Sequence, residues 1–226
     1  MEAIREATEF VHLNIGEVLY EKDGRIAAYY FPRECVVSIT NVLGDTRQVE
    51  AATTGREGFC GLPRVLGSAI SAHRLVVQVP GSALRLADPE LVKHMPYFSG
   101  RAALYANCII TTMSQSAACV AAHQVIERCA RWLLTTGDRT GRDSFMLTRQ
   151  YLGHMLGASR QSTNLAIEAL EAARLINYKF DTVTLENRSE LEAVCCECYE
   201  TVREAHDRYL QSDVVIDGRS VPGAFG

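Results

Sequence analysis

The chain has 226 residues, of which 47% are hydrophobic and 22% charged, and a formal net charge of -4 at pH 7. This length holds one large domain or two modest ones, and the apolar content is ordinary for a folded protein with a core. No uninterrupted apolar run is long enough to span a bilayer, and the acidic start of the chain lacks the apolar stretch of a signal peptide, so we expect a cytoplasmic protein.

The first 95 residues indicate β structure. Short segments rich in apolar and β-branched residues are separated by turn signals, and many short strands at regular spacing favour a barrel or jelly roll. Pro80–Gly81, between the last two segments, predicts a type II turn. The expected strands are Glu17–Tyr20, Ile26–Phe31, Cys35–Val42, Gln48–Thr53, Leu75–Val79 and Ala83–Leu86.

The segment Gly58–Gly67 differs from the strands around it, because three glycines and a proline interrupt an apolar stretch. Binding residues concentrate on loops that a scaffold holds in place. Two interpretations therefore stay open: a short helical turn that lines a pocket, or only a tight crossover of the barrel.

From Pro96 the hydrophobic period becomes helical. Small residues let two helices approach closely, so one seam of this helix predicts self-association; packing on the chain's own barrel is the alternative. A second helix is expected over His123–Thr136, followed by a polar loop over Gly137–Ser144. The seam follows alternating four- and three-residue spacing and comprises Leu104, Cys108, Thr111, Gln115, Ala118 and Ala122.

The stretch Leu147–Ile176 predicts two short helices joined by a glycine turn. Thr148 and Ser159 are good N-cap residues, and Gly157 takes the left-handed backbone that ends a helix. Long hydrogen-bonding side chains at the start of a second helix are typical of a helix-turn-helix that reads base edges, although a plain helical hairpin shares much of the pattern. The expected buried stripe is Thr163, Ala166, Ile167 and Leu170, which leaves Arg160, Gln161, Ser162, Asn164 and Leu165 off the core face.

A β-hairpin is expected over Asn177–Leu185, with its turn near Phe180–Asp181, so that the helix pair carries a wing. Lys179 and Tyr178 on this wing are candidates for phosphate contacts. A final helix over Ser189–Leu210 and a frayed tail complete the expected elements.

The acidic net charge is unevenly distributed. Residues 121–185 carry 8 basic and 6 acidic groups, a net +2, whereas residues 1–120 carry 11 and 12, a net -1, and residues 186–226 carry 4 and 9, a net -5. The only positive segment is therefore the one that contains the helix pair. Screening limits the reach of the distant acidic tail to roughly 8–10 Å, so this segment can still hold phosphates.

Eight cysteines are scattered through mostly apolar patterns, and buried thiols are the ordinary interpretation for a cytoplasmic protein. Cys195, Cys196 and Cys198 form the one tight group. Neighbouring positions on a helix point about 100° apart, so three such thiols cannot close one tetrahedral zinc site without help. We expect two buried thiols and one exposed thiol; a redox-sensing role is the alternative.

Several motifs resemble those of the Crp/Fnr family of bacterial transcription regulators, over nearly the whole chain. The C-terminal motifs are ERCARWLL (127–134), LTRQYLGHMLGASRQS (147–162), LEAARLINY (170–178) and TVTLENRSELEA (182–193). The N-terminal motifs are GEVLYEKDG (16–24), YYFP (29–32), GREGFCGLPRVLG (55–67) and VVQVPGSALRL (76–86).

This resemblance implies an α+β fold with four parts: a cyclic-nucleotide-binding-like β jelly-roll barrel over 1–95, a dimerisation helix over 96–122, a winged helix-turn-helix over 123–195, and a C-terminal helix and tail over 196–226. It also implies a homodimeric regulator whose second helices enter successive major grooves of a palindromic site. The implied partners are double-stranded DNA, a second copy of the chain and RNA polymerase. Residues Leu104, Cys108, Thr111, Gln115 and Ala118 are the candidates for dimerisation.

Carried over by position, the resemblance assigns a phosphate contact to Thr148 and the reading end of the recognition helix to Ser159, Arg160, Gln161, Ser162 and Asn164. Arg160 is the best candidate to grip guanine, because its fork fits O6 and N7; Gln161 suits adenine, and Ser162 and Lys179 suit phosphates. Many members carry an arginine where this chain has Leu165, which leaves Leu165 to meet a thymine methyl or to pack. The target site is therefore expected to differ from the sites best known for the family.

The effector side departs further from the family. Cyclic-nucleotide-binding members carry a Gly-Glu pair and an Arg-Ser pair, which map here to Gly61–Leu62 and Ala72–His73. A buried phosphodiester without a fixed cation is poorly compensated, so the sequence argues against a cyclic nucleotide, and a non-standard pocket is the alternative. Iron–sulfur sensing is also disfavoured, because no cysteine precedes Cys35. The candidates for an effector pocket are Gly58, Gly61, Leu62, Arg64 and His73.

Two other classes of protein fit the sequence less well. A cupin-type metal enzyme needs several histidines and a carboxylate inside the barrel, and this segment offers only the widely separated His12 and His73. No nucleophile elbow, P-loop or dinucleotide fingerprint is present. A pure ligand-binding module would leave the C-terminal third unexplained. We therefore predict no catalytic residues and no metal ligands.

Overall fold

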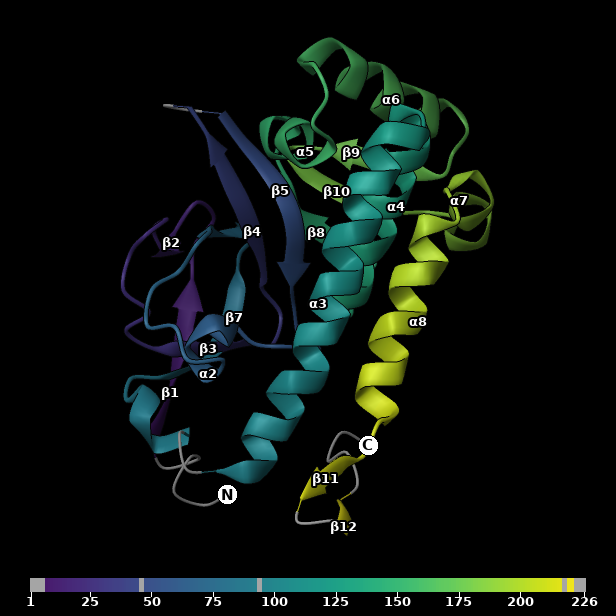
Figure 1. Cartoon of the computed structure of the whole chain (residues 1–226). Coiled ribbons are helices and arrows are strands. Elements are labelled where there is room, and N and C mark those ends of the chain that lie inside the picture. Colours follow the sequence, from purple (N-terminus) through teal and green to yellow (C-terminus); the bar gives the residue numbers. More distant parts are fainter. Residues whose placement is uncertain (1–6, 45–46, 93–94, 217–218, 222–226) are drawn as a thin grey trace.

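The computed structural model describes residues 7–44, 47–92, 95–216 and 219–221. A β-sandwich-like barrel forms one side of the molecule, and two long helices run next to each other along it (Figure 1). A compact group of shorter helices and strands lies at the top of this view. None of the described helices is long and apolar enough to cross a membrane.

Two antiparallel sheets build the barrel. One has the strand order β2-β6-β4-β5 and the other β1-β7-β3. In the larger sheet, the register pairs Val37 of β4 with Thr54 of β5 and with Val77 of β6. The strands are β1 (Thr8–Leu13), β2 (Val18–Tyr20), β3 (Tyr29–Pro32), β4 (Val36–Leu43), β5 (Arg47–Thr54), β6 (Arg74–Val79) and β7 (Gly81–Leu86).

The six expected strands are confirmed as β2 to β7, with shifted ends. Strand β1 was missed, because its exposed residues Glu9 and Phe10 break the inward-outward alternation that marks a half-buried strand. The type II turn expected at Pro80–Gly81 is wrong. Gly81 has no positive φ, and the chain here crosses from one sheet to the other, so that Gly81 lies against the backbone of Cys35.

The helix α3 (Pro96–Ala122) is attached to the barrel by aromatic side chains. Phe59 lies 5.2 Å from Phe98 and 5.4 Å from Tyr105, between ring centroids, and Tyr105 lies 5.3 Å from Tyr209 of the last helix. Aromatic pairs at these distances stabilise beyond the area they bury. Rings from the barrel, α3 and the last helix thus form one cluster. The connections nearby are α2 (Leu62–Val65) and the 3-10 helix η1 (Pro89–Val92).

The C-terminal half is helical with one small sheet. The helix pair and its wing are confirmed, and the wing gains a third strand, since the sheet order is β8-β10-β9. The elements are α4 (Val125–Thr140), β8 (Ser144–Met146), α5 (Arg149–Leu156), α6 (Arg160–Ala172), β9 (Ile176–Lys179), β10 (Thr182–Leu185), α7 (Arg188–Val194), α8 (Cys198–Gln211), β11 (Val214–Ile216) and β12 (Arg219–Val221).

Three expectations for this half were wrong. The polar loop expected over Gly137–Ser144 is shorter, because α4 continues to Thr140 and Gly141 ends it with a φ of 68°. The single helix expected over Ser189–Leu210 is broken between α7 and α8, where Cys195 adopts extended backbone. The tail expected to be frayed forms the hairpin of β11 and β12, in which Val214 packs against Gly100 of α3. Residues 217–218 and 222–226 of that tail lie outside the described residues.

A buried carboxyl group joins the barrel to the C-terminal half. Glu50 of β5 accepts hydrogen bonds from the hydroxyl of Ser38, at 2.8 Å, and from the indole N–H of Trp132 in α4, at 3.1 Å. Met155 of α5 lies 3.6 Å from the Ser38 hydroxyl. Burial raises the pKa of Glu50 from 4.5 to about 7, because the charged carboxylate is poorly solvated there.

The raised pKa of Glu50 predicts a pH-dependent effect of Glu50→Gln. The protonated carboxyl group contributes fully to stability below about pH 4.5, and this contribution is lost as the pH rises to about 7. A neutral glutamine avoids the loss, so the variant should gain stability relative to the parent between pH 5 and pH 8, by on the order of 3 kcal/mol. Denaturant unfolding of both proteins at pH 5 and pH 8 measures this gain. An equal difference in the free energy of unfolding between variant and parent at both pH values would contradict it.

Candidate DNA-binding surface

The helix pair α5 and α6 is set by its caps, as the sequence predicts. The hydroxyl of Thr148 accepts from the backbone N–H of Tyr151 at 3.2 Å, and that of Ser159 accepts from the N–H of Ser162 at 3.1 Å. Gly157 ends α5 with a φ of 57°. These bonds satisfy backbone N–H groups that have no partner within the helix at its start. The helices α5 and α6 therefore begin directly after Thr148 and Ser159.

The inner face of α6 is the predicted stripe, and all four of its residues, Thr163, Ala166, Ile167 and Leu170, are buried. Arg160 and Gln161 are exposed at the N-terminal end of the helix. Leu165, 59% exposed, stands on the outer face and does not pack in the core of the chain. The first turn of α6 therefore presents one guanidinium and one amide to solvent, with an apolar side chain one turn further.

Arg149 is a member of this surface that was not predicted from the sequence. Its guanidinium donates to the side-chain oxygen of Asn164 at 3.3 Å and lies 4.5 Å from the ring centroid of Tyr178, which places it against α6 and the wing together. Half-buried Asn164 is thus held by Arg149 in this structure. The phase of the helix alone does not show such a cross-element contact, so no sequence signal pointed to it.

The wing hairpin has the expected turn at Phe180–Asp181, but Tyr178 does not have the phosphate-contacting position that was predicted for it. Phe180 and Asp181 both have positive φ, 50° and 55°, as a two-residue hairpin turn requires. Lys179 is exposed, and Phe180 at the tip is 98% exposed. Tyr178, by contrast, is buried and donates its hydroxyl to the carbonyl of Leu147 at 2.6 Å, so it is not placed to contact phosphates.

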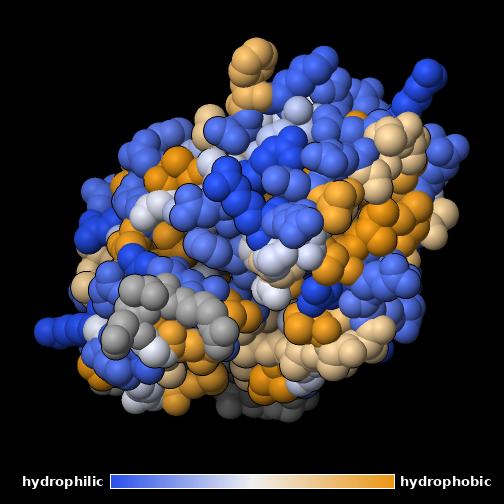
Figure 2. Space-filling model, turned by 90° about the horizontal axis from the view of Figure 1, so that it is seen from above, coloured by the Kyte–Doolittle hydropathy of each residue, from blue (hydrophilic) through white to orange (hydrophobic). Residues whose placement is uncertain are grey.

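The surface at this end of the molecule is mainly hydrophilic. Figure 2, which looks down from above onto the end that carries α5 and α6 in Figure 1, shows hydrophilic side chains across the centre. Hydrophobic side chains gather along the lower and right-hand sides of the same view. A polar centre of this kind suits contact with a hydrated, charged ligand such as a phosphate backbone.

The seam predicted on α3 is corrected by the structure. Cys108 is only 2% exposed, and Gln115 donates to the thiol of Cys198 at 3.1 Å, so this side of α3 faces α8 within one chain. Leu104 is half-buried among the aromatic cluster, and the hydroxyl of Thr111 bonds to the carbonyl of Asn107 in the same helix. Of the five dimerisation candidates only Ala118 is exposed.

A different seam of α3 is exposed when the described residues of the single chain are considered. It keeps the four-and-three spacing but is displaced by one residue toward the N-terminus, and Ile110 near its centre is 62% exposed. Its members are small or polar apart from Ile110. They are Ala103, Asn107, Ile110, Ser114, Ala117 and Ala121.

An apolar pocket of about 290 Å³ lies between the barrel and α3. Gly61, Leu62 and His73, three of the predicted effector residues, line it together with Tyr105 and Met113 of α3. Among the lining residues that the structure describes there is no lysine or arginine. Burial lowers the pKa of His73, which favours its neutral form.

The other two effector candidates lie outside this pocket. Arg64 turns away to the carboxylate of Glu90, at 2.8 Å, and to the carbonyl of Ile26, at 3.2 Å. Gly58 packs under Tyr105, whose ring would clash with any Cβ there. The helical-turn interpretation of Gly58–Gly67 is the one that the structure supports, since α2 lies in this segment and borders the pocket.

A buried ion pair, also missed from the sequence, links the barrel to α4 and α8. The Nε of Arg139 donates to the carboxylate of Glu57 at 3.0 Å, and a guanidinium nitrogen of Arg139 lies 3.5 Å from Nε2 of His206. Burial lowers the pKa of His206, and the charge of Arg139 lowers it further. Glu57, Arg139 and His206 border an open polar pocket of about 470 Å³.

The comparisons with known proteins agree with this geometry. A family model described as the Crp-like helix-turn-helix domain matches residues 127–194. That segment, which holds α5, α6 and the wing, therefore belongs to the Crp-like helix-turn-helix domains. No curated protein matches the chain.

Solved structures show that the likeness extends over the whole fold. The chain is similar to FixK2 from Bradyrhizobium japonicum, with a TM-score of 0.70 and 16% identity over 84% of this chain and 98% of that one. It is similar to TTHB099, a CRP-family transcriptional regulator from Thermus thermophilus, with a TM-score of 0.67 and 17% identity over 81% and 95%.

A third similar structure is the c-di-GMP-responsive regulator CLP from Xanthomonas campestris, with a TM-score of 0.60 and 17% identity over 81% of this chain and 96% of that one. The chain thus combines a Crp-like DNA-binding domain with the fold of Crp/Fnr regulators. The predicted fold class and the resemblance are confirmed at this level, and the class of protein they support is a DNA-binding transcription regulator.

The turn between α5 and α6 gives a paired prediction. An alanine at Gly157 would meet no neighbour but must adopt a φ of 57°, so Gly157→Ala should lower the free energy of unfolding by about 1–2 kcal/mol. Gly153 lies inside α5, and a Cβ there would be 3.4 Å from the hydroxyl of Thr163, an ordinary contact. Gly153→Ala should therefore leave stability unchanged or raise it by up to about 1 kcal/mol.

Thermal unfolding of both variants and the parent measures this contrast. If Gly157→Ala proved as stable as Gly153→Ala, the left-handed turn described for α5 would be wrong.

Proposed function

We propose that this protein is a transcription regulator that binds a palindromic DNA site as a homodimer, with α6 of each copy in a major groove. The observation that carries the proposal is the exposed first turn of α6 inside a Crp-like domain. Arg160 and Gln161 stand there next to the N-cap residue Ser159, whose hydroxyl accepts from the backbone N–H of Ser162. Arg160 reads guanine, Gln161 reads adenine, and Thr148, Ser162 and Lys179 take phosphates.

Two side chains extend this contact surface. Leu165, on the outer face of α6, meets a thymine methyl group, because this apolar side chain is exposed on the described part of the chain. Asn164 reads a base only after leaving its hydrogen bond with Arg149, so Arg149 tunes how freely Asn164 is available. The remaining polar groups position the domain on the duplex.

Dimerisation uses the exposed seam of α3 that contains Ile110, Ser114 and Ala117. Small side chains at four-and-three spacing let a second copy of the helix approach closely, and Ile110 supplies apolar area at the centre. The side of α3 that faces α8 is already covered within the chain. RNA polymerase is the further partner that the regulator class implies.

The effector that suits the pocket under α3 is a small uncharged apolar molecule. The pocket borders α3 through Tyr105 and Met113, so an occupant would contact the same helix that carries the dimer seam. A cyclic nucleotide is disfavoured, because its phosphodiester would be buried without a cation from the described lining.

Arginine substitutions at the two ends of α6 test the DNA contact. Arg160→Ala should weaken specific binding by about 1–3 kcal/mol and relax preference at one base pair of the selected site. Arg174→Ala, an equal loss of charge beyond the C-terminal end of α6, should change specific binding far less. Thr148→Ala should weaken binding to all sequences alike. Mobility shifts over a range of salt measure all three, and equal effects of the two arginine variants would contradict the docking.

A charge placed on the α3 seam tests the dimer. Ile110→Glu should shift the protein from dimer to monomer, because it buries a carboxylate without a partner at the helix contact. Phe10→Glu, at another exposed hydrophobic side chain on β1, is the matched control and should leave the dimer intact. Light scattering after size-exclusion chromatography reads the mass, and a dimeric Ile110→Glu protein would place the interface elsewhere.

A further inference from the structure

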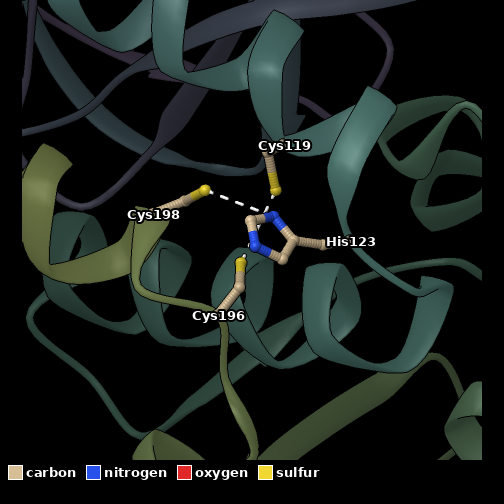
Figure 3. A group of neighbouring side chains, drawn as sticks. All are labelled: Cys119, His123, Cys196 and Cys198. Atoms are coloured by element: carbon tan, nitrogen blue, oxygen red, sulfur yellow. Dashed lines mark hydrogen bonds between the residues drawn. The ribbon is translucent and has the colours of Figure 1, made fainter.

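The break between α7 and α8 gathers three cysteines and one histidine. Cys119 and His123 come from the end of α3, and Cys196 and Cys198 come from the start of α8 and the residues before it (Figure 3). Each of these four residues offers one ligand atom, a thiol Sγ or an imidazole nitrogen, and these four atoms all lie within 4.8 Å of one another. Cys119, Cys196 and Cys198 are buried, and His123 is half-buried.

The break also removes the objection raised from the sequence. On one continuous helix, Cys196 and Cys198 would point in different directions, but the extended backbone of Cys195 lets both thiols turn toward α3. The missing ligands come from residues more than seventy positions earlier in the chain. Cys195 is half-buried and bonds to the carbonyl of Cys196 instead, outside this group. The expectation of no metal ligands rested on the sequence pattern alone, which does not show this arrangement.

The spacing of the four atoms fits one tetrahedral ion. Ligands about 2.3 Å from a zinc ion lie about 3.8 Å apart at the corners of a tetrahedron. The Sγ atoms of Cys119 and Cys196 are 3.5 Å apart, and the Sγ of Cys198 is 3.5 Å from Nδ1 of His123. An iron–sulfur cluster would need wider spacing, because its own atoms separate the ligands.

Neighbouring groups prepare these ligands for a cation. Nε2 of His123 lies 3.1 Å from the carboxylate of Glu197, which holds its proton on Nε2 and leaves the lone pair of Nδ1 facing the thiols. Gln115 donates an N–H to the thiol of Cys198. Metal-bound histidines commonly have such a carboxylate partner.

We propose that Cys119, His123, Cys196 and Cys198 bind one zinc ion in a closed four-ligand site. Three thiolates and a neutral imidazole are a typical ligand set of structural zinc, and four protein ligands leave no open position for catalysis. With the ion bound, the three thiolates and the neutral imidazole give the site a net charge of -1.

At this position, a bound ion would connect two helices that come from distant parts of the chain. His123 is the C-cap of α3, and α4 begins two residues later at Val125, so this point is the hinge between the long helix and the Crp-like domain. Cys196 and Cys198 follow the end of the segment that matches that domain. One ion therefore fixes the end of α3 to the start of α8 at the hinge.

Metal analysis of the purified full chain, prepared under reducing conditions without added chelator, tests the site. We expect one zinc ion per chain by elemental mass spectrometry. Cys119→Ser and Cys196→Ser should each lose nearly all of it, whereas Cys195→Ser, the adjacent cysteine outside the group, should keep one ion. Equal loss in Cys195→Ser and Cys196→Ser would overturn the ligand set.

A second measurement does not depend on how the variants fold. Cobalt(II) added to metal-free parent protein should give the thiolate charge-transfer and intense visible bands of tetrahedral sulfur-rich coordination, at one equivalent per chain. Absence of zinc from the parent together with absence of these bands overturns the proposal. So does a Cys119–Cys196 disulfide in protein kept under reducing conditions, detected by intact mass.

The effect of the ion on DNA binding rests on the proposed function and is measured separately. Removing the metal should weaken specific DNA binding by about 5- to 150-fold, the range of a typical coupling between two sites, and zinc should restore it. If the protein binds one ion but no DNA, the proposed function fails and the metal site stands. If DNA binding occurs and no ion is found, the metal site fails alone.

Discussion

The packing of α3 on two sides is the constraint on which the rest of the structure depends. One side meets the barrel through Tyr105 and the aromatic cluster. A second side meets α8 through Cys108 and Gln115, and meets Cys196, just before α8, through Cys119. Only a third side is left for another copy of the chain. The same helix therefore borders the apolar pocket, carries the proposed dimer seam and ends next to the Crp-like helix-turn-helix domain.

This division of α3 explains how a signal in the barrel would reach DNA. An occupant of the pocket would contact α3 through Met113, and the C-terminal domain contacts the barrel independently through half-buried Glu50 and buried Trp132. A shift of α3 must then be accommodated at the hinge of His123 or at the Glu50 contact. The proposed zinc site would stiffen the first of these points, and ionisation of Glu50 would weaken the second.

Local patterns predicted the helix pair α5 and α6 well, because caps and helical period are local properties. Thr148, Gly157 and Ser159 were found from their chemistry, and the buried stripe of α6 from its spacing. The side of α3 predicted for dimerisation is largely covered within the chain, because nothing in α3 itself shows that α8 packs against the side with Cys108.

The cysteine group escaped prediction for two physical reasons. The break at Cys195 carries no glycine or proline to signal it, and Cys119 and His123 approach only through tertiary packing. The contacts of Arg149 with Asn164 and Tyr178 were missed because they too form only through tertiary packing. A period along one helix cannot report what packs against that helix.

The central claim is sequence-specific binding of a dimer through α6, and selection from random duplex DNA by mobility shift tests it most directly. We expect recovery of an inverted repeat with half-sites one helical turn apart, centre to centre, which spans about 34–36 Å of B-form DNA. Its half-sites should include a guanine that loses its preference in the Arg160→Ala protein. Recovery of no palindromic site, with and without cell extract, would contradict the account.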